Sequence, residues 1–168
     1  RSIDRYWGGR TRFERLNLDG AMLWMQYLSR NIYSNEGDNY GISPAMQNNN
    51  WQAFFNDGLV NFQRIITETG PQGTTPNANY EGVALVMRSW LFSVMTDLWG
   101  AIPYNDALKG TSTEAIYTPA YDAQEKIYEA LLNDLKIANE KLNPAGPAIT
   151  GDIVHNGNIM RWKRFANS

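Results

Sequence analysis

The chain has 168 residues, a formal net charge of −2 at pH 7, no cysteine, and 43% hydrophobic and 19% charged residues. These values predict one globular domain with a real hydrophobic core. They argue against nucleic acid as a partner, because a nearly neutral chain lacks the basic field that holds a phosphate backbone. Without cysteine there is no disulfide, thiolate nucleophile or cysteine-ligated zinc site.

The first predicted helix covers residues 12–33, where apolar side chains recur at roughly helical intervals although Gly20 weakens the middle. Residues 34–50 are rich in Asn, Gly and Asp and are predicted to form a loop. A second helix is predicted over 50–69, because large apolar residues recur there at intervals of three and four and Gly70 and Pro71 then end the pattern. The apolar stripe consists of Trp51, Phe55, Leu59, Phe62 and Ile66.

The third predicted helix, over 78–99, is apolar on nearly every side. Arg88 is the one charged residue between Glu81 and Asp97, so this helix is expected at the centre of the fold. It is too short and too charged to span a membrane. The other helices are expected to cover it with their own apolar stripes.

The fourth predicted helix covers 122–142, and Asp122 and Glu125 have the spacing of a capping box at its start. A last helix is predicted from about Asn158, and it has no evident stop signal before Ser168. The outward residues of the helices carry mixed charge, which suits a partly polar interface that opens and closes. They are Arg64, Glu68, Glu125, Glu129, Lys136 and Glu140.

The chain shows no pattern typical of an enzyme, and neither a catalytic residue nor a cofactor is predicted. His155 is the single histidine, and no Gly-x-Ser-x-Gly motif accompanies it, so a structural or solvent-exposed role is favoured. One histidine without cysteine excludes most zinc patterns. Asp38, near Asn35 and Asn39, lacks EF-hand spacing and is better explained by turn formation than by calcium binding.

Carbohydrate binding is favoured for the 34–50 loop, with Asn39, Tyr40 and Asn49 as the candidate ligand-binding residues. An aromatic ring covers the C–H face of a sugar, and amide groups both donate to and accept from sugar hydroxyls. An ordinary polar loop is the alternative, because turns commonly use asparagine. The aromatic residues on helical stripes are expected in the core instead; they include Trp51, Phe55, Phe62, Trp90 and Trp99.

Three blocks in the second half of the chain resemble the SusD/RagB-like family of outer-membrane nutrient-binding lipoproteins. The first is TDLWGAIPY at 96–104 with DAL at 106–108, similar to the family's aromatic-Gly-Asp-Val/Ile-Pro-Tyr segment. The second is PAYDAQEKIY at 119–128, similar to its Pro-x-Tyr-Asp-x-Gln-x-x-Ile-Tyr helix. The third is GDI at 151–153 with WKRFANS at 162–168. Ala101, His155 and Asn158 depart from the usual residues at turn or cap positions.

The resemblance implies an all-α fold of antiparallel helical hairpins with tetratricopeptide-like packing. Residues 1–168 would then form a partial SusD-like helical domain that lacks the C-terminal part of the family fold. It further implies a binding protein on the outward-facing surface of the cell outer membrane, with a lipid anchor that is absent from this chain. The expected partners are an oligosaccharide or polysaccharide and a SusC-like TonB-dependent transporter. The family's motif residues are fold markers, and they transfer no ligand contacts.

Other functions remain open on the sequence. A helical protein–protein scaffold would use the aromatic residues only as core, and it would bind a protein partner but no glycan. A peptide-binding SusD-like protein would keep the family role with a different ligand. A glycoside hydrolase would release sugar from a polysaccharide, and it needs a carboxylate pair for which the sequence offers no support.

Overall fold

The computed structural model describes residues 17–32, 37–110 and 115–168. The chain divides into two compact units, unit 1 over Arg1–Gly58 and unit 2 over Leu59–Ser168. The described residues are helical or irregular, and their one extended pairing is an isolated antiparallel bridge between Ile102 and Asp122. The predicted all-α class is therefore confirmed for the described part of the chain.

Unit 1 is built from short helical segments joined by irregular backbone. They are a π-helix η1 (Asn17–Ala21), α3 (Met22–Trp24), a 3-10 helix η2 (Gly37–Asn39) and α4 (Pro44–Gln52). A π-helical stretch, η3 (Ala53–Leu59), crosses the boundary between the two units. Helix α4 continues without a break through η3 into the helix that follows. The other segments are only three to five residues long and have few internal hydrogen bonds, so side-chain packing rather than helix propensity must hold them.

The helix predicted over 12–33 is wrong beyond Trp24. Gln26 has a φ of 58°, a left-handed conformation that a right-handed helix cannot contain. The Gln26 amide donates to the Leu23 carbonyl at 3.0 Å, and the chain then continues as turns and irregular backbone. Residues 12–16 and 33 lie outside the described residues.

The loop predicted over 34–50 is wrong in its second half, because α4 begins at Pro44. The Ser43 side chain accepts a hydrogen bond from the Met46 amide at 3.2 Å and caps the helix. Serine before proline is a strong start signal, because proline at the first position loses no intrahelical hydrogen bond. The helix start was missed because the asparagines at 48–50 favour a turn or loop in a sequence-based prediction. Residues 34–36 lie outside the described residues.

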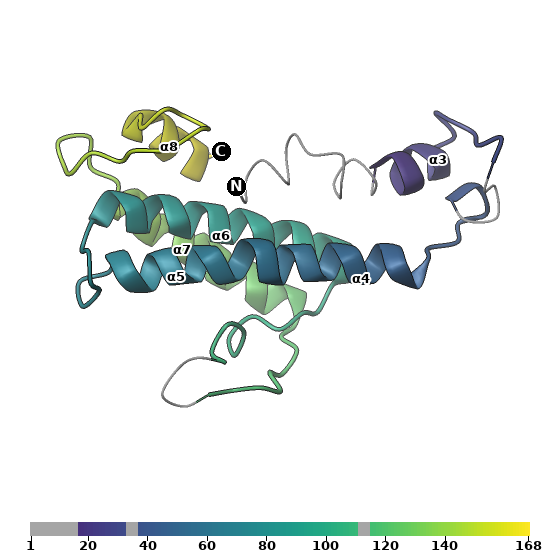
Figure 1. Cartoon of the computed structure of the whole chain (residues 1–168), viewed down its shortest axis with the longest axis horizontal. Helices are drawn as coiled ribbons and strands as arrows, with labels where there is room; N and C mark the ends of the chain where they lie inside the picture. The colour runs from purple at the N-terminus through teal and green to yellow at the C-terminus, as the bar shows by residue number, and fades with distance from the viewer. Residues whose placement is uncertain (1–16, 33–36, 111–114) are drawn as a thin grey trace. The chain divides into compact units, whose positions relative to one another are not determined.

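Unit 2 contains the long helices α5 (Val60–Thr69), α6 (Ala78–Trp99) and α7 (Gln124–Lys141), followed by α8 (Ile159–Ala166). Figure 1 shows α5, α6 and α7 side by side, and α6 packs against both of the others. Helices α5, α6 and α7 run in alternating directions, as helical hairpins do (Figure 1). The short helix α8 packs against α6 and α7.

Helix α6 is central, as its nearly all-round apolar sequence predicts. Its wholly buried apolar side chains include Leu91 and Met95, each 0% exposed. The helix begins where the Asn77 side chain accepts from the Asn79 and Tyr80 amides, and it ends at Gly100, whose φ is 71°. These boundaries agree with the predicted helix over 78–99.

Gly82 on α6 allows a close approach to the C-terminal end of α7. A Cβ atom at this position would lie 3.0 Å from Cγ and Cδ2 of Leu142 and 3.2 Å from the carbonyl oxygen of Ala138. Leu142 is itself only 1% exposed, so it has little room to move. A glycine in the middle of a helix costs stability, and here the close packing of the two helices explains its presence.

The capping box predicted at the start of α7 is wrong. The helix begins at Gln124, and its N-cap residue is Ala123, which has no side-chain capping hydrogen bond. The Asp122 carboxylate instead accepts from the amides of Tyr104 and Asn105 at 3.0 and 2.9 Å, and from the Asn105 side chain at 2.7 Å. With the Ile102–Asp122 bridge, these bonds tie together the two ends of the α6–α7 loop (residues 100–123).

Asp152 organises the turn before α8. Its carboxylate accepts from the amides of Val154, His155 and Gly157 at 2.9–3.2 Å and from the indole N–H of Trp162 at 2.7 Å. Burial opposes the charge, but these donors outweigh it and lower the pKa of Asp152. Trp162 is 1% exposed, so the Gly-Asp and Trp parts of the third sequence block meet in the core.

His155 has a structural role, as the sequence predicts. Its ring packs edge-on against Trp162, with the ring centroids 4.8 Å apart. The expectation that aromatic residues on helical stripes are core holds fully for Phe62, which is 6% exposed. Trp51, Phe55, Trp90 and Trp99 are only half-buried.

Candidate functional site

Tyr40 lies in unit 1 directly after η2, and its ring is 66% exposed. Its φ is 58°, a left-handed conformation that is uncommon for a large side chain. The Tyr40 hydroxyl donates to the carbonyl oxygen of Trp24 at 3.3 Å. The strained backbone at Tyr40, together with the hydrogen bond from its hydroxyl to Trp24, holds the ring at the surface rather than in the core.

The three predicted ligand-binding residues do not all belong to one loop. Asn39 is the last residue of η2 and is exposed beside Tyr40. Asn49 is also exposed, but it lies within α4, about 8 Å along the helix from Pro44 at 1.5 Å per residue. The structure brings Asn39 and Tyr40 together and leaves Asn49 on a separate helical element.

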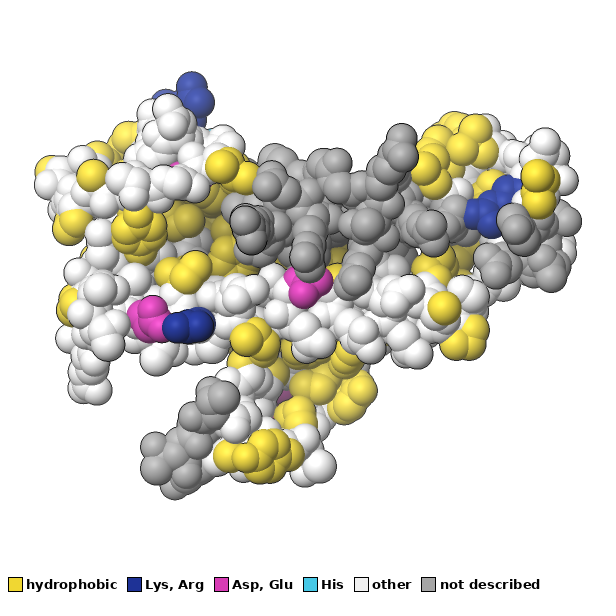
Figure 2. All heavy atoms as spheres, viewed as in Figure 1, with side chains coloured by type: hydrophobic (Ala, Val, Ile, Leu, Met, Phe, Trp, Pro, Cys, Tyr) yellow, Lys and Arg dark blue, Asp and Glu magenta, His cyan; other side chains and the backbone are white. Residues whose placement is uncertain are grey.

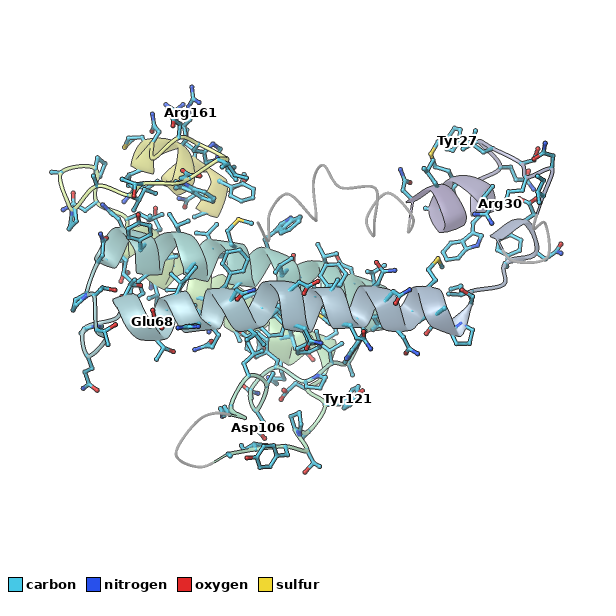
Figure 3. All side chains as sticks on the ribbon, viewed as in Figure 1. Tyr27, Arg30, Glu68, Asp106, Tyr121 and Arg161 are labelled. Atoms are coloured by element: carbon cyan, nitrogen blue, oxygen red, sulfur yellow. The ribbon has the colours of Figure 1, made fainter. Side chains whose placement is uncertain are left out.

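Other exposed apolar side chains of unit 1 were not predicted. Tyr27 is 74% exposed and stands out from the segment after α3, near Arg30 (Figure 3). Figure 2 shows hydrophobic side chains gathered at the surface around α3. We call this set the unit 1 apolar surface; its members are Met25, Tyr27, Leu28, Ile32, Tyr40 and Ile42. Tyr27 was predicted on the apolar stripe of a helix over 12–33, whereas the structure exposes it after that helix has ended.

A cluster of polar side chains in unit 2 was also missed. The Arg88 guanidinium on α6 donates to Asp134 Oδ2 on α7 at 2.6 Å and to Gln63 Oε1 on α5 at 2.6 Å. The Tyr104 hydroxyl, from the α6–α7 loop, donates to the same Asp134 oxygen at 2.9 Å. The sequence marked Arg88 as a lone charge on an apolar helix, but nothing in it identified partners 25 and 46 positions away.

The Arg88 cluster borders a cavity of about 380 Å³. Helices α5, α6 and α7 and the α6–α7 loop all contribute to its wall. The lining side chains include Gln63, Phe92, Asn105, Lys109, Asn133 and Asp134. Burial raises the pKa of Tyr104, and the neighbouring Asp134 carboxylate raises it further, so the hydroxyl keeps its proton and remains a donor.

The described residues contain no group of three or more His, Cys, Asp or Glu side chains that could hold a metal ion. Asp38 is explained by local structure, because its Oδ2 accepts from the Arg30 amide at 3.1 Å. His155 packs edge-on against both Trp162 and Phe165.

In the described part of the chain, none of the helices is long and apolar enough to cross a membrane. Residues 11–168 match the family described as SusD-like, starch-binding and associating with the outer membrane. The chain belongs to the SusD-like family. The match covers the three sequence blocks, so the resemblance inferred from them is confirmed.

Solved structures of SusD-like proteins have the same fold. A chitin-binding protein is 28% identical with a TM-score of 0.76, and the match covers 91% of this chain and 32% of that one. A SusD homologue from Bacteroides fragilis is 32% identical with a TM-score of 0.58 over 68% of this chain and 23% of its own. A Bacteroidetes SusD-like protein is 23% identical with a TM-score of 0.80, covering 99% of this chain and 30% of that one. The search of curated proteins finds no match.

The family membership confirms the predicted tetratricopeptide-like packing of helical hairpins. It also accounts for the three sequence blocks, whose key residues in this structure serve the fold. Asp122 ties the ends of the α6–α7 loop, and Asp152 joins the turn before α8 to Trp162. The chain spans about a third or less of the SusD-like structures that it matches.

Proposed function

We propose that the protein containing this chain captures oligosaccharides or polysaccharides at the outward-facing surface of the cell outer membrane. The observation that carries the proposal is the family match over residues 11–168, to proteins described as starch-binding and associating with the outer membrane. The chitin-binding structure, 28% identical, supports a glycan ligand. The near-neutral charge of the chain agrees with a neutral polysaccharide.

The site proposed for this ligand is the unit 1 apolar surface with its neighbouring amides. Tyr40 and Tyr27 offer rings for stacking against sugar C–H faces. Asn39, beside Tyr40, offers an amide for sugar hydroxyls. Asn49 is a more distant candidate, because it extends the site only for a ligand long enough to reach along α4.

We propose that bound glycan passes to a SusC-like TonB-dependent transporter, and that the protein holds its ligand without cleaving it. A lipid anchor would supply the membrane contact. The surface that would contact the transporter is the mixed-charge outer face of the helices, where Glu129 and Glu140 are exposed. The alternatives are a helical scaffold without a glycan ligand and a peptide-binding SusD-like protein.

The test uses the full-length protein, incubated with chitin and with starch as insoluble polysaccharides. We expect saturable retention on at least one of them and no release of reducing ends. Modest affinity is enough, because a dissociation constant of about 1 mM needs only about −4 kcal/mol. Retention on neither polysaccharide, with capture of a peptide or protein instead, would favour the alternatives. Reducing-end release that persists through purification would contradict binding without cleavage.

A further inference from the structure

The cavity beside Arg88 has the chemistry of a second ligand site. It lies wholly in unit 2, whereas Asn39, Tyr40 and Asn49 belong to unit 1. Its volume of about 380 Å³ is within the range of small-molecule sites in proteins. We propose that this cavity binds one pyranose unit of a neutral saccharide. This proposal does not depend on the glycan site of unit 1.

The cavity wall is electrically balanced, which selects against an anionic ligand. The Arg88 guanidinium is paired with Asp134 at 2.6 Å, and both side chains are 17% exposed. The Lys109 ammonium is paired with Asp106 at 3.1 Å. Each positive charge at the wall therefore has its own carboxylate, and a phosphate or carboxylate ligand would have to displace one of them.

The wall nevertheless offers hydrogen-bonding groups for hydroxyls. Asp134 uses Oδ2 for both Arg88 and Tyr104, and within the described part of unit 2 its Oδ1 accepts no hydrogen bond. Gln63 uses its side-chain oxygen for Arg88, which leaves its amide N–H groups for another partner. Asn133 adds an exposed amide that can donate and accept. Adjacent acceptors and donors of this kind match neighbouring hydroxyls on a sugar ring.

The cavity also has an aromatic boundary, where Phe92 and Tyr104 meet edge-to-face with ring centroids 4.7 Å apart. Phe92 is 2% exposed and is held by the core of unit 2. The Arg88 and Tyr104 hydrogen bonds fix Asp134 from two directions. A site whose polar groups are held before the ligand arrives loses less entropy on binding.

The experiment separates the two sites by working in the Tyr40→Ala background of the full-length protein. Saturation-transfer difference NMR is recorded with glucose, N-acetylglucosamine and glucuronate as separate probes. Asn133→Trp places a bulky side chain at the exposed rim of the cavity and keeps both partners of the Arg88–Asp134 pair. Glu140→Trp is the matched control, because it puts the same residue on the same exposed helix about 10 Å further along.

We expect a neutral sugar to bind the Tyr40→Ala protein with a dissociation constant of about 1 mM or lower. Asn133→Trp should weaken that binding at least about tenfold, and Glu140→Trp should leave it unchanged. The proposal is overturned if neither neutral sugar binds saturably, or if Asn133→Trp has no effect. Binding of glucuronate alone would also overturn it, because the site would then be selective for an anion. None of these results depends on whether Tyr40 contacts glycan.

Discussion

The two units both expose some large apolar side chains, but they differ in how much of their structure is held by long packed helices. In unit 2 the charged groups that reach the helix interfaces are paired, Arg88 with Asp134 at 2.6 Å and Glu81 with Lys141 at 2.8 Å. In unit 1 large apolar side chains such as Tyr27 and Tyr40 remain mostly exposed. An apolar surface that is left open costs free energy, so it is typical of an interaction site.

This contrast separates residues that maintain the fold from residues that are free to meet a ligand. Long helices in unit 2 bury whole stripes, and the buried side chains of Asn79 and Glu81 on α6 have partners from the segment at the end of α7. The segments of unit 1 are too short to bury their own side chains, and two of their residues, Gln26 and Tyr40, have positive φ. Substitutions of buried residues in unit 2 should therefore affect stability, and substitutions on the unit 1 apolar surface should affect binding.

The largest expected loss of stability comes from Trp162→Ala. The side chain is 1% exposed and its indole N–H donates to Asp152 at 2.7 Å. Removing it should lower the free energy of unfolding by about 3–5 kcal/mol, measured by denaturant titration. Trp162→Phe is the control, because it keeps a ring and loses the hydrogen bond, and its loss should be smaller. Equal stability of all three proteins would contradict the structural role of this residue.

Asp152→Asn should cost less, roughly 1–3 kcal/mol at pH 7, because it weakens charge-assisted hydrogen bonds without creating a cavity. The pKa of Asp152 is lowered in the folded protein. The ionised group therefore stabilises the fold above its unfolded pKa of about 4, and this contribution is lost as the pH falls through the lower folded value.

Melting temperatures measured from neutral to acidic pH test this sign. The wild-type protein should lose the Asp152 contribution only below pH of about 4, and Asp152→Asn should lack that part of the acid dependence. Asp38→Asn is a useful comparison, since its carboxylate accepts a single amide of unit 1 at 3.1 Å. If the melting temperature of Asp152→Asn fell with acid as steeply as that of the wild-type protein, other carboxylates would be the cause of the acid dependence.

Tyr40→Ala should change binding far more than stability. The ring is 66% exposed, so the free energy of unfolding should stay within about 0.5 kcal/mol of the wild-type value. Binding to the retained polysaccharide should weaken, because a stacking ring is lost. Tyr40→Gly is the matched control: glycine adopts positive φ without strain, so this variant should be at least as stable as Tyr40→Ala. A sharp fall in melting temperature would place Tyr40 in the core instead.

The smallest stability effect is expected from the double charge reversal Glu129→Lys and Glu140→Lys. Both side chains are exposed, and Glu129 loses only a surface pair with Lys126, in which 60% of its side chain is exposed. If these faces dock the transporter, its co-purification should fall while the melting temperature stays the same. Unchanged co-purification would place the docking surface elsewhere.

The long helices of unit 2 could be predicted from the sequence because their buried apolar residues recur at helical spacing within each segment. Helix α6 needs only the spacing of its apolar residues and the Asn77 cap to be located. The start of α7 could not be located in the same way. The Asp122 and Glu125 pattern is local, but Asp122 finds better partners 17 and 18 positions back, at Asn105 and Tyr104. The tertiary contacts of Asp122 therefore replace the capping box that its local sequence predicts.

The candidate sites were less predictable for a related reason. Tyr40 could be selected because an aromatic residue stands among asparagines, but the exposure of Tyr27 depends on where the preceding helix ends. That end is set by backbone conformation at Gln26, for which the residue type gives no signal. The cavity beside Arg88 is assembled from three helices and a loop, and no sequence interval links Gln63, Arg88 and Asp134.

The tied ends of the α6–α7 loop have a consequence for how the protein can evolve. Hydrogen bonds at Ile102, Tyr104 and Asn105 all converge on Asp122, so the helices are joined at the base of the loop. Residues 115–121, which lie between these ends and do not line the cavity, can gain, lose or exchange side chains without altering the register of α6 and α7, since lengthening such a loop costs little entropy. The exposed Tyr117, at 82%, lies in that permissive stretch. Natural variation in length and composition should therefore concentrate there, on a scaffold that stays unchanged.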